Sequence, residues 1–144
     1  MYLSPNVVTA GMVAICSLAA AAIDLRTRRV PNTLTGAAAA AGIVLAVTRF
    51  GEVGMVPAIL GGLLGLTLMM PGYLFGATGG GDVKLLAAIG TLLGPERIVI
   101  AFFVMAIGGG LIALATAAAR RRFRNETFAY APAIAIGCLY AVLR

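Results

Sequence analysis

The sequence is poor in the residues that coat a water-soluble protein. Only 11% of its 144 residues are charged, histidine and tryptophan are absent, and five acidic residues stand against eleven basic ones. An ordinary soluble domain carries roughly 25% charged residues. With 61% hydrophobic residues and 19 glycines, too few polar side chains remain to cover the surface that so short a chain exposes. These absences exclude a water-soluble globule and predict an integral membrane protein.

The missing residue types also restrict the chemistry. Without histidine there is no Ser-His or Cys-His pair, and the two cysteines, Cys16 and Cys138, are too far apart for a CxxC pair. We therefore expect no metal site and no cofactor, and we interpret both cysteines as packing residues. A Walker lysine loop, which would bind the phosphates of a nucleotide, is absent as well. No basic groove is visible, so nucleic acid is not an expected partner.

Stretches without charge divide the chain into six apolar segments and leave no room for a separate soluble domain. We predict an all-α integral membrane protein with one transmembrane domain, residues 1–144, and six transmembrane helices. The segments are residues 1–23, 30–48, 53–81, 85–95, 98–119 and 127–143. No basic residue precedes the first of them, which is therefore expected to remain as a span and not to be a cleaved signal.

The fourth segment is short for a membrane span. A helix over residues 85–95 covers roughly half of a ~30 Å hydrocarbon core, whereas counting residues 80–94 gives roughly 22 Å, which a locally thinned bilayer accommodates. If all six segments cross, eight basic residues share one side and three the other; if the fourth returns, the division is six against five. The positive-inside rule thus favours six crossings, with both termini away from the cytoplasm.

Small residues recur inside the predicted spans. They form the run 37–42, the glycines of 61–65 and the three glycines of 108–110. Small side chains let membrane helices approach closely when lipid supplies no hydrophobic drive between them. We therefore predict tight helix packing within the domain.

Two of the five acidic residues are in an unusual position. Glu52, Glu96 and Glu126 lie in connecting segments beside arginines and are interpreted as solvated charges. Asp24 and Asp82 instead abut apolar segments, and the predicted orientation puts both at the cytoplasmic boundary of the membrane. A carboxyl group at that depth is costly unless it is paired or hydrated, so each needs a partner or a function.

A structural and a functional interpretation stand beside each other for these two residues. Asp24 could form an ion pair with Arg28, four residues further on, and Asp82 could cap the start of a helix. Alternatively the two carboxyl groups form an aspartic dyad that shares one proton. One group then takes a proton from water while the other donates one to a substrate carbonyl, and peptide hydrolysis follows.

The predicted helix ends distinguish the two acids. Asp24 lies near a helix C-terminus, whose partial negative charge favours the protonated form, and Asp82 lies near a helix N-terminus, which favours the carboxylate. We therefore predict Asp82 as the base and Asp24 as the acid. A Ser-Lys dyad would need the single lysine, Lys84, with Ser4 or Ser17. The predicted topology places Ser4 on the opposite side and Ser17 about two turns into the membrane.

Two stretches resemble the type IV prepilin peptidases, which are membrane aspartic endopeptidases of the GxGD type. They are AAIDLRTRRVPNTLTG, with Asp24, Pro31 and Asn32, and GGGDVKLLAAIG, with Gly79, Gly81 and Asp82 as GxGD. A third stretch, YAPAIAIG at 130–137, is similar to the last helix of that family. The resemblance covers nearly the whole chain, and the paired motifs make it specific.

The resemblance implies a protease at the cytoplasmic membrane. Asp24 and Asp82 would be the catalytic pair that removes the leader of a prepilin, a substrate with a basic leader and an apolar helix, at the cytoplasmic face of the inner membrane. The resemblance further implies motif-supporting or substrate-binding roles for Gly79, Gly81, Pro31, Asn32 and Lys84. We interpret Lys84 itself as a snorkelling surface residue.

One departure from the longer family members restricts the activity. Those that also methylate the new pilin N-terminus carry a cytoplasmic insertion with paired cysteines, for which the first loop, residues 24–31, is too short. We expect a peptidase without a methyltransferase activity or zinc-binding insertion, similar to the short peptidases of tight-adherence (Flp) pili.

Other interpretations remain open at the level of the sequence. Archaeal preflagellin peptidases share the dyad. A small transporter could use Asp24 and Asp82 to relay protons or bind a cation, and a scaffold would only pack with partner helices. The exact pilin substrate and the oligomeric state, a homo-oligomer included, are not determined by the sequence.

Overall fold

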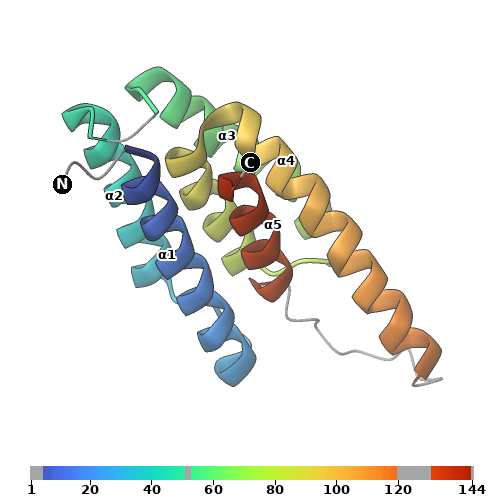
Figure 1. The fold of residues 1–144 in the computed structure, drawn as a ribbon. Coiled ribbons are helices and arrows are strands. Elements are labelled where there is room, and N and C mark those ends of the chain that lie inside the picture. The colour runs from blue at the N-terminus through green and yellow to red at the C-terminus, as the bar shows by residue number, and fades with distance from the viewer. Residues whose placement is uncertain (1–4, 51–52, 120–130, 144) are drawn as a thin grey trace.

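The computed structural model describes residues 5–50, 53–119 and 131–143, and these are arranged as helices joined by short connections, without any strand (Figure 1). The helices are α1 (Pro5–Thr27), α2 (Asn32–Thr48), α3 (Met55–Leu74), α4 (Gly80–Ala119) and α5 (Ala131–Leu143). The all-α prediction is confirmed. Three helical stretches, Val7–Thr27, Met55–Leu74 and Gly80–Ile112, are long and apolar enough to cross a membrane, while α2 and α5 are shorter apolar helices.

α4 consists of two helical halves that meet at Gly94. This glycine has φ 76° and ψ 178°, outside the helical region, and Pro95 follows it. A side chain is disfavoured at such a positive φ, so the turn depends on glycine. The half before Gly94 and the half after it run in opposite directions, as the turn at the upper end of Figure 1 shows. The two halves correspond to the fourth and fifth predicted segments, and six crossings stay a prediction.

The predicted boundary after the third segment was wrong. The segment was expected to continue to residue 81, but α3 ends at Leu74. The chain turns at Gly76, with φ 71°, and the backbone N–H groups of Ala77 and Thr78 donate to the carbonyl of Gly72 at 2.8 and 3.2 Å. These bonds satisfy carbonyl groups left open at the helix end. Residues 75–79 therefore form a connection, and α4 begins at Gly80.

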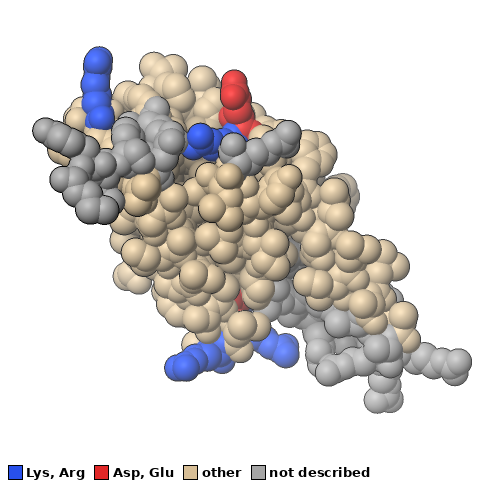
Figure 2. All heavy atoms as spheres, viewed as in Figure 1, with Lys and Arg blue, Asp and Glu red and all other residues tan. Residues whose placement is uncertain are grey.

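Charged side chains gather at the two ends of the molecule, and on the face seen in Figure 2 the described surface between them is largely uncharged. Arg26, Arg28 and Arg29 are exposed at the end of α1, while Arg49 is exposed at the end of the oppositely directed α2. Large apolar side chains are exposed between these ends, among them Val44 at 57% and Phe103 at 58%. This distribution is that of an integral membrane protein. The basic cluster 120–124 lies outside the described residues, so the predicted orientation is not tested.

α4 is the central helix of the bundle, in contact with each of the other four. Glycines permit its closest contact, which is with α3: a Cβ atom at Gly61 would collide with the carbonyl of Gly90, and one at Gly90 with the carbonyl of Gly61. Gly65 meets the Leu86 carbonyl in the same way, at 2.6 Å from an added Cβ. The predicted role of small residues in helix packing is confirmed at this contact.

The core lies around the first half of α4. Its largest fully buried side chains come from three helices, namely Leu85, Leu86, Ile89, Ile98, Ile134 and Val13. Cys16 and Cys138 are both buried and unbonded, as expected of packing residues. Because α1 and α5 cover one side of α4 while α2 and α3 cover another, the start of α4 is held in a fixed position.

We predict that Gly90→Ala lowers the free energy of unfolding by about 1–3 kcal/mol, because the new methyl group meets the backbone of α3. The matched control is Gly110→Ala, since nothing lies within 4 Å of a Cβ at Gly110 and the change raises helix propensity. Equilibrium unfolding in mixed micelles measures both variants. Equal stability of the two would contradict the close α3–α4 contact.

Candidate active site

The two motifs meet at one end of the bundle, where α1 and α3 end and α2 and α4 begin. Asp24 lies in the last turn of α1 and Asp82 in the first turn of α4. Their side chains are only 5% and 7% exposed, and the two carboxyl groups are near enough to interact electrostatically. Two acids that are 58 positions apart in the sequence therefore share one buried site.

The surroundings of Asp24 exclude the ion pair that its sequence spacing suggested. α1 ends at Thr27, and Arg28 has a left-handed φ of 53°. The backbone N–H of Arg28 donates to the backbone carbonyl of Asp24 at 2.7 Å, but the Arg28 side chain is exposed and forms no ion pair with the Asp24 carboxyl group. The Oδ2 atom of Asp24 is buried and has no hydrogen-bond partner. The proposed Asp24–Arg28 pair was therefore wrong, because the helix does not continue to Arg28.

Asp82 is held by the glycine residue that precedes its helix. The carbonyl of Gly79 accepts hydrogen bonds from the backbone N–H groups of Asp82 at 3.1 Å and Val83 at 3.4 Å. The backbone N–H of Gly79 donates in turn to the Asp82 carboxylate. Asp82 therefore stabilises the helix start from within the first turn, as the acidic member of a capping box does, and is not itself the N-cap residue. This bond uses one oxygen of the Asp82 carboxyl group and leaves the other oxygen available to interact within the shared site.

Gly81 brings the two motifs into contact. A Cβ atom at Gly81 would lie 3.1 Å from the Cβ atom and 3.3 Å from the carbonyl oxygen of Val30, in the segment between α1 and α2. At Gly79, by contrast, a Cβ atom would make only an ordinary contact, 3.6 Å from Oδ2 of Asp82. The second glycine of GxGD therefore permits the close approach of the Val30 segment, and the first is not sterically required.

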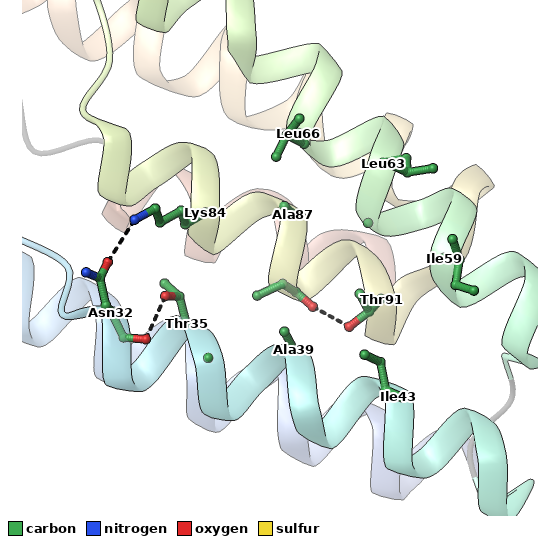
Figure 3. Close-up of a pocket in the computed structure, with 13 residues that line it drawn as sticks. Asn32, Thr35, Ala39, Ile43, Ile59, Leu63, Leu66, Lys84, Ala87 and Thr91 are labelled. Atoms are coloured by element: carbon green, nitrogen blue, oxygen red, sulfur yellow. Dashed lines mark hydrogen bonds between the residues drawn. The ribbon is translucent and has the colours of Figure 1, made fainter.

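The other predicted motif residues join α2 to α4. Pro31 precedes α2, and its carbonyl accepts the backbone N–H of Leu34 at 3.1 Å. Asn32 is the first residue of α2, and its side-chain Oδ1 accepts a hydrogen bond from Nζ of Lys84 at 3.2 Å (Figure 3). Lys84 is exposed, as the snorkelling interpretation predicted, but it also has a specific partner. The sequence did not predict this hydrogen bond. Its only signal was that Asn32 belongs to the first motif and Lys84 to the second.

The competing catalytic interpretation finds no support in the geometry. The hydroxyl of Ser17 is fully buried and donates to the Val13 carbonyl of its own helix at 2.6 Å, while Lys84 contacts Asn32. The structure therefore does not pair Ser17 with Lys84. Ser4 lies outside the described residues. Within the described ranges no three potential ligands gather as a metal site.

The remaining acids are separate from this site. Glu96 is exposed beside the turn at Gly94, at the other end of the bundle. It is the solvated charge that the sequence predicted. Glu52 and Glu126 were assigned in the same way and lie outside the described residues.

Comparison with known proteins identifies the family. The model of the type IV leader peptidase family matches residues 11–114, which include both aspartates and all five supporting motif positions. The chain belongs to this family. The resemblance seen in the two motifs is therefore confirmed.

A curated member of the type IV leader peptidase family gives a partial match. The prepilin leader peptidase/N-methyltransferase of Bacillus subtilis (strain 168) is 40% identical over 68 residues, which are 47% of this chain and 27% of that protein. The chain thus matches about a quarter of that relative's length. No solved structure matches the chain.

We predict that Gly81→Val displaces the Val30 segment, misplaces the end of α1 relative to Asp82, and so lowers any prepilin cleavage that depends on the two aspartates by about tenfold to 100-fold. Gly79→Ala is the matched control within the same motif and keeps activity close to that of the unaltered protein. Cleavage of a prepilin in reconstituted membranes measures both, alongside thermal stability in detergent. If Gly79→Ala lost activity and Gly81→Val did not, the first glycine of GxGD and not the second would be the sterically required one.

Proposed function

We propose that this protein is a membrane aspartic endopeptidase that removes the leader peptide of type IV prepilins of the Flp type at the cytoplasmic boundary of the inner membrane. One observation carries the proposal: Asp24 and Asp82, from two separate motifs of a type IV leader peptidase, are buried together and interact electrostatically. Burial makes two adjacent negative charges unfavourable, so one shared proton is the stable state of the pair. That is the protonation state which an aspartic dyad uses for hydrolysis.

The reaction follows from this shared proton. The ionised carboxylate accepts a proton from a water molecule, and the water oxygen bonds to the carbonyl carbon at the cleavage point. The protonated carboxyl group donates its proton to the carbonyl oxygen as the double bond opens. When the resulting diol collapses, the carbon–nitrogen bond breaks, the leaving amine takes a proton from one acid, and a diol hydroxyl gives its proton to the other. The dyad gains one proton from the water and one from the diol, and it loses one to the carbonyl oxygen and one to the amine. It therefore ends the cycle with the single proton with which it began.

The assignment of the two roles stays a prediction. The hydrogen bond from the Gly79 N–H to Asp82 favours a carboxylate there. This bond supports Asp82 as base, and the helix ends support Asp24 as acid. Burial of Asp82 and the nearby Asp24 charge act in the opposite direction and outweigh that bond, because both disfavour the charged form of Asp82. Neutron diffraction would locate the proton, and a proton on Asp82 in the resting state would contradict the assignment.

We further propose that the protein has peptidase activity and no methyltransferase activity. The chain between α1 and α2 consists of residues 28–31, which leaves no room there for the insertion that accompanies methyltransferase activity in longer relatives. The short connection also keeps Asp24 close to Val30 and hence to α4. Incubation with a methyl donor and a processed pilin should therefore leave the pilin N-terminus unmethylated.

We expect Asp24→Asn and Asp82→Asn, each tested alone, to reduce cleavage of a prepilin in reconstituted membranes by about 10²- to 10⁴-fold, the range for loss of an acid–base group. Glu96→Gln is the matched control, because it removes an exposed carboxylate from the other end of the bundle. Thermal stability in detergent confirms that each variant is folded.

The result also separates the protein from its non-enzymatic alternatives. Full processing by either aspartate variant would end the dyad proposal. If the unaltered protein cleaves no prepilin but moves protons or a cation in an Asp82-dependent manner, it is a transporter. A scaffold would lose only stability in the aspartate variants.

A further inference from the structure

An apolar groove runs along the outside of α4 between α2 and α3 (Figure 3). Its volume is about 690 Å³. Ile43 of α2 and Ile59 and Leu63 of α3 line its sides and are 44%, 51% and 57% exposed. The groove exists because α2 and α3 each pack on α4 but make little contact with each other. In a membrane it opens toward lipid and not toward water.

The surface of the groove is shaped for a helix. Its lining includes Gly36 and Ala39 on α2, Gly62 on α3, and Ala87 on α4. Small side chains of this kind allow a further membrane helix to bring its backbone close, whereas a lipid chain has no need of them. The space at Gly36 is empty, since a Cβ atom there would meet nothing within 4 Å.

One end of the groove is polar and lies at the start of α4, the helix that carries Asp82. Lys84, two residues after Asp82, and Asn32, directly after Pro31, line this end and are hydrogen-bonded to each other. The Lys84 ammonium group has three donors and no acidic partner within the described residues. It therefore complements carbonyl oxygens or an acidic group at that end of an occupant. The end of a helix lying in the groove would thus be within about one helical turn of Asp82, counted along the axis of α4.

We propose that this groove docks the apolar helix of the prepilin substrate, with the start of that helix at the Lys84–Asn32 end. This inference rests on the proposed function and names the surface by which the same site selects its substrate. The leader and the cleavage point then extend from the polar end toward the aspartates. Packing along the groove supplies affinity, and the length of the docked helix fixes the peptide bond that reaches the dyad.

The test is to fill the groove without altering the fold. Gly36→Leu places a side chain in the empty space, and Gly110→Leu is the matched control on the second half of α4, where a Cβ also meets nothing within 4 Å. Two substrates are compared in reconstituted phosphatidylcholine vesicles: a full prepilin, and a short peptide that spans the cleavage point but lacks the apolar helix.

We expect Gly36→Leu to raise KM for the full prepilin about tenfold, because the added side chain overlaps the docked helix, and to leave cleavage of the short peptide unchanged. Gly110→Leu should change neither. Equal effects of Gly36→Leu on both substrates, or no effect on the full prepilin, would overturn the groove proposal. Asp24→Asn should reduce cleavage of both substrates by about 10²- to 10⁴-fold, so its result tests the proposed function separately.

A second measurement detects docking without catalysis. In the Asp82→Asn background and with a thiol oxidant such as copper phenanthroline, Gly36→Cys should form a disulfide with a cysteine placed in the apolar helix of the prepilin, and Gly110→Cys should not. Such cross-links without any cleavage by the unaltered protein would support the groove and refute the peptidase. Absence of cross-links at position 36 would overturn the docking proposal, whether or not lipid occupies the groove.

Discussion

The burial of two interacting carboxyl groups is the constraint on which the rest of the site depends. Asp24 and Asp82 are almost completely removed from solvent, and neither has a basic partner among the described side chains. Burial makes two adjacent negative charges unfavourable, and in the proposed function the pair therefore holds one proton between its members. Backbone hydrogen bonds hold both aspartates in this unfavourable arrangement. The N–H of Arg28, just after α1, donates to the carbonyl of Asp24, and the N–H of Asp82 donates to the carbonyl of Gly79, just before α4.

Glycine residues provide this fixed geometry at two levels. At the site, Gly81 lets the segment before α2 lie against the first turn of α4. Deeper in the bundle, Gly61 and Gly90 let α3 and α4 meet backbone to backbone, which anchors the helix that carries Asp82. Membrane helices gain little from hydrophobic burial against each other, so close van der Waals contact carries the stability that a soluble core would obtain from water exclusion.

The same packing accounts for the groove beside the site. α2 and α3 both use α4 as their packing surface, and their separation leaves the outer face of α4 partly uncovered. The Lys84–Asn32 hydrogen bond joins α2 to α4 at the end nearest the aspartates. The groove residues Lys84, Ala87 and Thr91 and the Asp82 side chain thus lie on opposite faces of the first half of α4. In the proposed function, α4 would receive the substrate helix on one face and present Asp82 to the cleavage point from the other.

The sequence by itself determined the membrane character, the helical segments and the two motifs, because hydrophobic runs and glycine spacing are local properties of the chain. It also indicated that a short fourth segment ends near Gly94. It did not determine that α1 stops before Arg28, which left Asp24 without the expected ion pair, or that Lys84 bonds Asn32. Only the tertiary structure decided these contacts and the groove between α2 and α3, because they depend on how helices far apart in the sequence are spaced and rotated around α4.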